Sequence, residues 1–173
     1  MIVDRFWLIG LVVLLVSCGG KGPQIPSKRS NEPILVDSTA LALMEMNQQL
    51  AQAADEQLMK LAMSQDEPYA LYEAHTWIHI IDRGDTDRPA PKYGQVCQIH
   101  TRTYDLNGTL LLDAEGTYTR GKNELPPALD RNIGELHPGG KARMYAPWYS
   151  AYGITGKGNI PPYENVIIEI ELR

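Results

Sequence analysis

The histidines and cysteines are the side chains with the most obvious capacity for chemistry, and they are few. His75 and His79 have a spacing that on a helix would let both imidazoles bind one metal ion. The residues from Thr76 to Ile81 are mostly β-branched or aromatic, however, and are predicted to form a strand. Hydrogen-bonded or solvated histidines are therefore favoured over a metal site. No convincing catalytic triad, metal cluster or phosphate-binding loop is visible, so neither a metal nor a cofactor is expected.

The two cysteines have different sequence contexts. Cys18 follows a short apolar run, Trp7 to Val16, about half as long as a bilayer span requires. The run ends in Leu15-Val16-Ser17-Cys18-Gly19, which resembles the lipobox of bacterial lipoproteins; an ordinary signal peptide or a buried strand is the alternative. The resemblance implies cleavage before Cys18 and lipid attachment to its sulfur. Cys97 lies in an alternating strand pattern and is expected to be a buried, unreactive thiol.

Length and charge limit the remaining possibilities. A chain of 173 residues with 43% apolar content can bury one core. Its formal net charge of -5 and scattered basic residues give no reason to expect nucleic acid as a partner. We predict a signal peptide over residues 1–17, a flexible tether rich in Gly, Pro, Ser and Lys over 18–37, a helix over 38–67 and a β-rich domain over 68–173.

The predicted N-terminal helix carries one apolar stripe. Its members recur at intervals of three and four residues: Leu43, Met46, Leu50, Ala54, Leu58 and Leu61. Because propensity alone does not stabilise a helix of this length, the stripe must pack on something. Two partners are possible, the protein's own β-rich domain or the same helix of a second copy in a homodimer.

The C-terminal part shows alternating strand patterns. Strands are predicted at 76–81, at 95–105, at 110–112 after the Asn107-Gly108 turn, at 141–146 and at 165–172.

The segment Gly134-Glu135-Leu136-His137-Pro138-Gly139-Gly140-Lys141-Ala142-Arg143 resembles a helix end, turn and strand of FKBP-type peptidyl-prolyl cis-trans isomerases. Ser150-Ala151-Tyr152-Gly153 and Asn159-Ile160-Pro161-Pro162 follow in family order, and Tyr118 to Leu125 resembles the entry to the central helix. The resemblance covers Trp77 to Leu172. It implies an α+β fold, a bent antiparallel β-sheet wrapping one short α-helix, here from about Ala128 to Leu136 and preceded by the long N-terminal helix. The whole chain resembles FKBP-like lipoproteins associated with gliding motility.

The implied activity fits the absence of reactive groups. Rotation about an X–Pro bond faces a barrier of roughly 20 kcal/mol from amide resonance. Catalysis needs a dry pocket that binds the twisted amide better than either planar form, and no nucleophile or cofactor. The expected substrates are proline-containing polypeptide clients, and the expected role is assistance to the folding of exported proteins.

The resemblance also assigns site residues. Tyr152 matches the hydroxyl donor to the bound peptide's carbonyl. Leu125 and Ile160 match pocket-wall positions, and Leu129 matches the pocket floor. Tyr118 matches an aromatic wall position, and Ile168 matches the back wall. Asp113 with Leu112 is the best match to an aromatic-Asp pair.

The chain departs from the family where the floor tryptophan and a strand tyrosine are replaced by Leu129 and Thr101. Less aromatic area against a prolyl ring implies weak turnover. A non-catalytic chaperone or a structural lipoprotein of an envelope assembly, in gliding or secretion, is the alternative. Trp148 and Tyr149 could be core anchors or an exposed rim that holds clients. Gly19 after Cys18, with no acidic neighbour, suggests lipid anchoring in the outer membrane, facing the periplasm.

Overall fold

The computed structural model describes residues 38–173. The predicted signal peptide, the lipidation site Cys18 and the tether over 18–37 lie outside the described residues. Helix α2 (Ser38–Met63) is followed by β1 (Ala70–Leu71), the 3-10 turn η2 (Glu73–His75), β2 (Trp77–Asp82), β3 (Val96–Tyr104) and β4 (Leu110–Thr119). Then come α3 (Pro127–Asn132), η3 (Ile133–Glu135), β5 (Lys141–Ala146) and β6 (Val166–Leu172). The predicted α+β class is confirmed.

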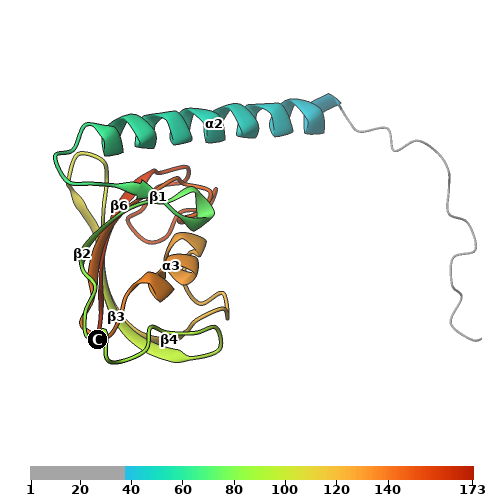
Figure 1. The fold of residues 1–173 in the computed structure, drawn as a ribbon. Helices are drawn as coiled ribbons and strands as arrows, with labels where there is room; N and C mark the ends of the chain where they lie inside the picture. Colours follow the sequence, from blue (N-terminus) through green and yellow to red (C-terminus); the bar gives the residue numbers. More distant parts are fainter. Residues whose placement is uncertain (1–37) are drawn as a thin grey trace, which may run out of the picture. The chain divides into compact units, whose positions relative to one another are not determined.

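The strands form one antiparallel sheet in the order β1-β2-β5-β6-β3-β4. The last strand, β6, therefore lies between β5 and β3 rather than at an edge. The sheet bends around α3, which lies on its concave side (Figure 1). This is the predicted arrangement of a curved sheet wrapping one short helix.

The sheet has an inner face toward α3 and an outer face away from it, and the period of two decides which side chains lie on each. On β3, Ile99 and Thr103 are buried, whereas Arg102 is exposed. On β6, Ile168 is 0% exposed and is paired with Thr103 across the ladder. The inner face and α3 form one apolar core. Its largest fully buried members are Ile99, Leu129, Ile133, Leu136, Met144, Val166, Ile168 and Leu172.

Helix α3 begins with a proline at its first turn, where the missing N–H costs no hydrogen bond. Leu129 and Ile133 then face the sheet and are 1% and 0% exposed. Asn132 Nδ2 donates to the carbonyl oxygens of Ala128 and Glu73, at 2.8 and 3.0 Å. These bonds hold the η2 turn against α3.

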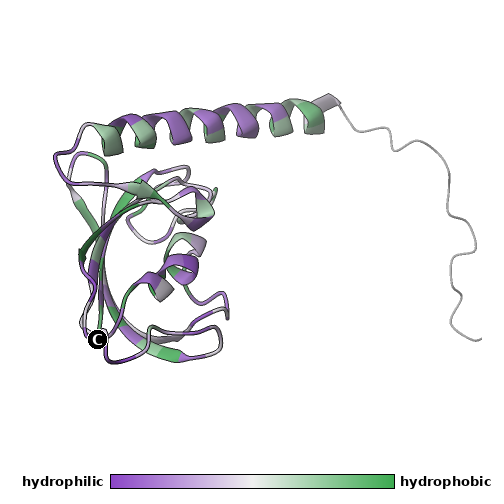
Figure 2. Ribbon diagram, viewed as in Figure 1, coloured by the Kyte–Doolittle hydropathy of each residue, from purple (hydrophilic) through white to green (hydrophobic). Residues whose placement is uncertain are grey.

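The apolar stripe of helix α2 is buried against the domain over the C-terminal half of the helix. Leu58 is fully buried in a cluster with Tyr145 and Ile167, which belong to the outer face of the sheet. Leu43 and Leu50 in the other half are 52% and 40% exposed. Packing on its own domain is therefore correct for the second half of the predicted stripe, and apolar residues continue along the first half (Figure 2). Among residues 38–173, no helix has the length and apolar content to cross a membrane.

Candidate active site

The residue with the most specific predicted role, Tyr152, lies on a compact turn between β5 and β6. The turn is closed by backbone bonds: Ser150 N and Ala151 N both donate to Pro147 O at 3.0 Å, and Gly153 N donates to Trp148 O at 2.7 Å. The Ser150 carbonyl accepts from Ala128 N at 2.8 Å, which ties the turn to the start of α3. This bond holds the turn and the start of α3 together on the concave side of the sheet.

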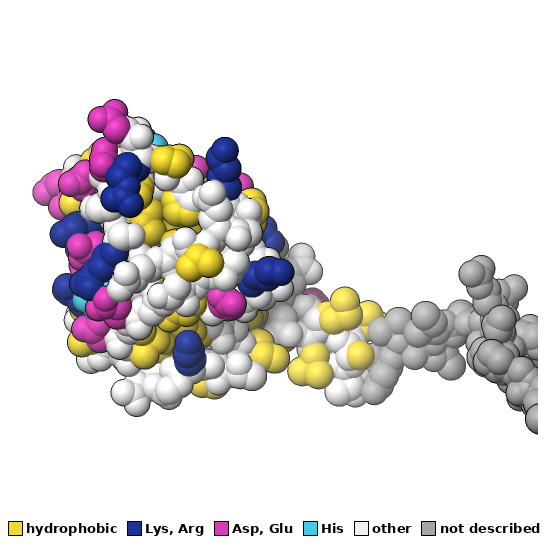
Figure 3. Space-filling view, turned by 90° about the horizontal axis from the view of Figure 1, so that it is seen from below, with side chains coloured by type: hydrophobic (Ala, Val, Ile, Leu, Met, Phe, Trp, Pro, Cys, Tyr) yellow, Lys and Arg dark blue, Asp and Glu magenta, His cyan; other side chains and the backbone are white. Residues whose placement is uncertain are grey.

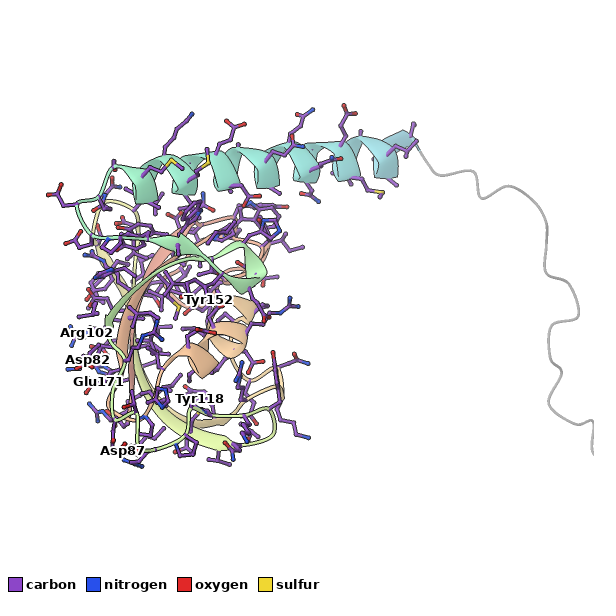
Figure 4. The ribbon with its side chains drawn as sticks, viewed as in Figure 1. Asp82, Asp87, Arg102, Tyr118, Tyr152 and Glu171 are labelled. Carbon is purple, nitrogen blue, oxygen red and sulfur yellow. The ribbon has the colours of Figure 1, made fainter. Side chains whose placement is uncertain are left out.

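The Tyr152 hydroxyl points to the inner face of the sheet, where it lies 3.1 Å from Thr103 Oγ1 on β3. Figure 4 shows Tyr152 on the concave side, beside α3. Burial raises the pKa of Tyr152, and the Thr103 hydroxyl lowers it by a smaller amount. The phenol is therefore neutral at physiological pH and keeps a proton that it can donate.

Tyr118 supplies a second aromatic wall, and Gly116 makes room for it. Both residues face inward on β4, and a Cβ on Gly116 would come within 2.9 Å of the Tyr118 ring and hydroxyl oxygen. Any side chain at position 116 would therefore displace the ring. Tyr118 is half-buried, as is Leu125 at the end of the loop that leads to α3.

Leu129 on α3, Ile168 on β6 and Ile160 in the loop before β6 form the floor. They are 1%, 0% and 2% exposed, respectively. Tyr118, Leu125 and Tyr152 pack against the same cluster and remain partly accessible. The structure thus brings six predicted site residues together. The Tyr152 hydroxyl and the half-buried side chains of Tyr118 and Leu125 lie over a fully buried apolar floor.

Sequence and structure comparisons bear on this arrangement. Residues 88–173 match the family model described as FKBP-type peptidyl-prolyl cis-trans isomerase. The chain carries an FKBP-type domain. A search of curated protein sequences gives no match.

Solved structures show the same fold as this FKBP-type domain. A peptidyl-prolyl cis-trans isomerase from Pseudomonas syringae pv. tomato has a TM-score of 0.60 at 16% identity, covering 72% of this chain and 92% of its own. FkpA from Escherichia coli has a TM-score of 0.60 at 18% identity, covering 79% of this chain and 64% of its own. The N-terminal domain of FKBP42 from Arabidopsis thaliana has a TM-score of 0.54 at 22% identity, covering 63% and 92%. The fold of the FKBP-type domain supports peptidyl-prolyl isomerase activity in general.

Asp113 does not join the other predicted site residues of the FKBP-type domain. It is paired with Arg102 across the β3–β4 ladder, and its Oδ1 lies 2.6 Å from His100 Nε2. Because Arg102 and Thr103 point to opposite faces, Asp113 lies on the outer face, away from the Tyr152 hydroxyl. The expectation that Asp113 belongs to the cleft is corrected accordingly.

Two other features of the FKBP-type domain were not predicted from its sequence. Thr103 is the partner of Tyr152, and only its place in the alternation of β3 could have indicated an inward side chain. Arg120 clamps the helix end, since its guanidinium donates to the carbonyl oxygens of Pro91, Asp130 and Arg131. The guanidinium lies across Gly134, where a Cβ would overlap it at 2.1 Å. The arginine thereby satisfies carbonyls that the end of α3 leaves open.

The alternatives left open by the sequence are decided by contacts in the described residues. His79 Nδ1 lies 3.0 Å from Pro68 O, and His75 Nδ1 lies 3.4 Å from an Asp55 carboxylate oxygen, so both histidines have polar partners. Trp148 is 8% exposed, as a core anchor should be. Cys97 is buried as predicted, and burial raises the pKa of its thiol.

Proposed function

We propose that this protein is a peptidyl-prolyl cis-trans isomerase that acts on proline-containing segments of exported polypeptides while anchored to a membrane. One observation carries the proposal. A neutral, half-buried tyrosine hydroxyl, that of Tyr152, lies over an apolar cluster at the point where the FKBP-type fold offers a concave face.

In the proposed mechanism the prolyl ring rests between Tyr118 and Leu125, and the Tyr152 hydroxyl donates to a carbonyl of the bound peptide. The peptide carbonyl would replace Thr103 Oγ1 as the hydrogen-bond partner of that hydroxyl; between the two hydroxyls of the free protein, either can be the donor. Removing the imide from water weakens the resonance that keeps it planar, and the apolar walls favour the twisted form. No proton transfer and no covalent intermediate is required.

Two features favour slow turnover. Leu129 provides less apolar area than an aromatic floor residue, and at 1% exposure it is covered by its neighbours. Thr103 also competes with the substrate for the Tyr152 hydroxyl. The expected rate enhancement is therefore modest. It depends on Tyr118, Leu125 and Tyr152 more than on the floor.

A test is the isomerisation rate of proline tetrapeptides, followed by NMR exchange so that no protease is needed. We expect Tyr152→Phe to lower kcat/KM roughly 10-fold and Leu129→Ala to lower it less. Tyr93→Phe serves as the matched control, since Tyr93 is 61% exposed and outside the cluster. A wild-type rate equal to the uncatalysed rate would exclude the enzyme.

Membrane attachment is proposed through lipid on Cys18, at the outer membrane and facing the periplasm. Two or more acyl chains give a stable anchor, because each buried methylene contributes about 0.8 kcal/mol. Labelled palmitate should enter the wild type and not Cys18→Ser, and the variant should leave the membrane fraction. Labelling of Cys18→Ser at the wild-type level would contradict this assignment.

A second candidate function, a non-catalytic FKBP-like chaperone or structural lipoprotein of an envelope assembly, is favoured by the first half of α2. Leu43, Met44 and Met46 are 52%, 66% and 46% exposed. We propose a second copy of the chain as their partner, in a homodimer built on this helix. Sedimentation should give a dimer that Leu43→Gln with Met44→Gln dissociates. A monomeric wild type at high micromolar concentration would overturn the dimer.

A further inference from the structure

Helix α2 makes side-chain hydrogen bonds to the segment that carries Tyr152. Asp55 accepts from the Tyr149 hydroxyl at 2.5 Å, and Gln57 Oε1 accepts from Asn165 Nδ2 at 3.0 Å. Nearer the start of the helix, Asn47 Oδ1 accepts from the Tyr163 hydroxyl at 3.4 Å. The partners are spread from the turn after β5 to the residue before β6. The helix therefore contacts the segment at both ends.

Tyr149 is the strongest of these links. Its hydrogen bond to Asp55 is short and charge-assisted, and such bonds are about twice as strong as neutral ones. The ring makes edge contacts with Trp148 and His75, at centroid distances of 5.5 and 5.9 Å. Burial raises the pKa of Tyr149, so the phenol remains a donor to the carboxylate. The ring is thus fixed by its neighbours and the hydroxyl by Asp55.

Tyr149 and Tyr152 lie on the same turn. The backbone bonds from Ser150 N, Ala151 N and Gly153 N close residues 147–153 into one unit. The Tyr149 side chain of this unit is bound to α2, and the Tyr152 side chain is bound to Thr103 on β3. Because the unit is rigid, a shift at Tyr149 moves the Tyr152 hydroxyl as well.

We propose that Asp55 is a positioning residue for the isomerase site: through Tyr149 it holds the turn at the angle that aims the Tyr152 hydroxyl toward the inner face of the sheet. The inference rests on the proposed function and adds a role for α2 to its packing on the outer face of the sheet. Misplacing a binding group by about 1 Å can cost up to 100-fold in rate, so a loosened turn should have a measurable effect.

The first test compares kcat/KM of full-length variants. Asp55→Ala should lower it roughly 3- to 10-fold, with a similar loss in Tyr149→Phe and no further loss in the double variant. Asp55→Asn keeps an acceptor oxygen and should restore most of the rate. Gln52→Ala, at an exposed position of α2 one turn before Asp55, is the matched control and should change the rate less than twofold.

Measuring Asp55→Ala in the Tyr152→Phe variant distinguishes positioning of the Tyr152 hydroxyl from a general loosening of the fold. If Asp55 acts through the Tyr152 hydroxyl, Asp55→Ala should have no effect once that hydroxyl is gone. An equal loss in both backgrounds, or an unchanged rate for Asp55→Ala in the wild-type background, would overturn the proposal.

A readout without turnover keeps the proposal independent of the isomerase assignment. In protein labelled with ¹³C-tyrosine, Asp55→Ala should shift the Tyr152 ring signals and Gln52→Ala should not. If the wild type is inactive but the signals shift, the proposed function fails while the link from α2 to Tyr152 stands. Unshifted Tyr152 signals in Asp55→Ala would refute the link whatever the activity.

Discussion

The two faces of the curved sheet are built from the same strands and have different tasks. The inner face is apolar and holds the hydroxyls of Thr103 and Tyr152. The outer face has charged pairs beside the apolar cluster under α2, and acidic and basic side chains gather along one margin of the view from below (Figure 3). On that face Lys141 lies 3.7 Å from Glu171, and Arg102 lies 3.8 Å from Glu169. Such exposed pairs contribute little to stability. The comparison teaches that face, more than position along the chain, decides what a residue does here.

The largest difference between the two faces should appear in the free energy of unfolding when a residue of each face is replaced by alanine. Ile168→Ala removes a fully buried side chain from the central strand and should lower the free energy of unfolding by about 3 to 4 kcal/mol. Glu171→Ala on the outer face of the same strand should cost less than about 1 kcal/mol. Urea unfolding of both variants measures the contrast. Comparable losses would show that the outer pairs matter as much as the core.

A polar change on the inner face should have an intermediate effect. Thr103→Val leaves the Tyr152 hydroxyl without its partner and should lower the free energy of unfolding by about 1 kcal/mol. Thr117→Val, on the exposed side of β4, is the control with the same chemical change and should have no measurable effect. A Thr103 variant as stable as the wild type would mean that water replaces the lost hydrogen bond.

Alkaline pH should act on the buried tyrosines. Burial raises the pKa of Tyr69, Tyr149 and Tyr152 above the ordinary value of 10.0. The unfolded chain therefore loses these protons first, so their contribution to stability is complete below pH 10 and is lost as pH rises further. Tm should fall above pH 10, and less in Tyr152→Phe. A Tm that is flat to pH 12 would contradict the raised pKa values.

The smallest effect is expected at Asp113. Because its carboxylate pairs with His100 on the outer face, Asp113→Asn should change kcat/KM less than twofold while Tyr152→Phe changes it strongly. The same exchange assay on both variants decides the point. A large loss in Asp113→Asn would place this carboxylate in the cleft and remove the distinction between the faces at this strand.

The strand pattern predicted much of the fold, and the family resemblance supplied the candidate site residues. Residues 141–146 were expected as a strand and form one, because their apolar side chains alternate without interruption. Tyr152 and Leu129 were assigned by family resemblance; Tyr152 lies on a turn closed by backbone hydrogen bonds, and Leu129 lies on α3. The returning strand was predicted only to Leu112 and runs to Thr119, since Gly116 and the polar residues near it weaken the apolar signal.

The face on which Asp113 lies and the extent of α2 packing could not be predicted from the sequence. The ladder of β3 and β4 shifts register between Thr103 and Tyr104, and an irregularity of this kind changes which residues share a face. The apolar stripe of α2 likewise extends beyond the part of the helix that packs on the domain surface. Neither the bulge nor the extent of that surface is encoded in a local pattern.

The central place of β6 has a consequence for how the protein is made. Residues 166–172 bridge β5 and β3, so until they arrive the sheet consists of separate pieces with two unpaired edges. Contacts between distant parts of a chain form late and slowly. A nascent chain that has not yet released these residues from the ribosome therefore has no closed core. It stays in an open state until the central strand completes the sheet.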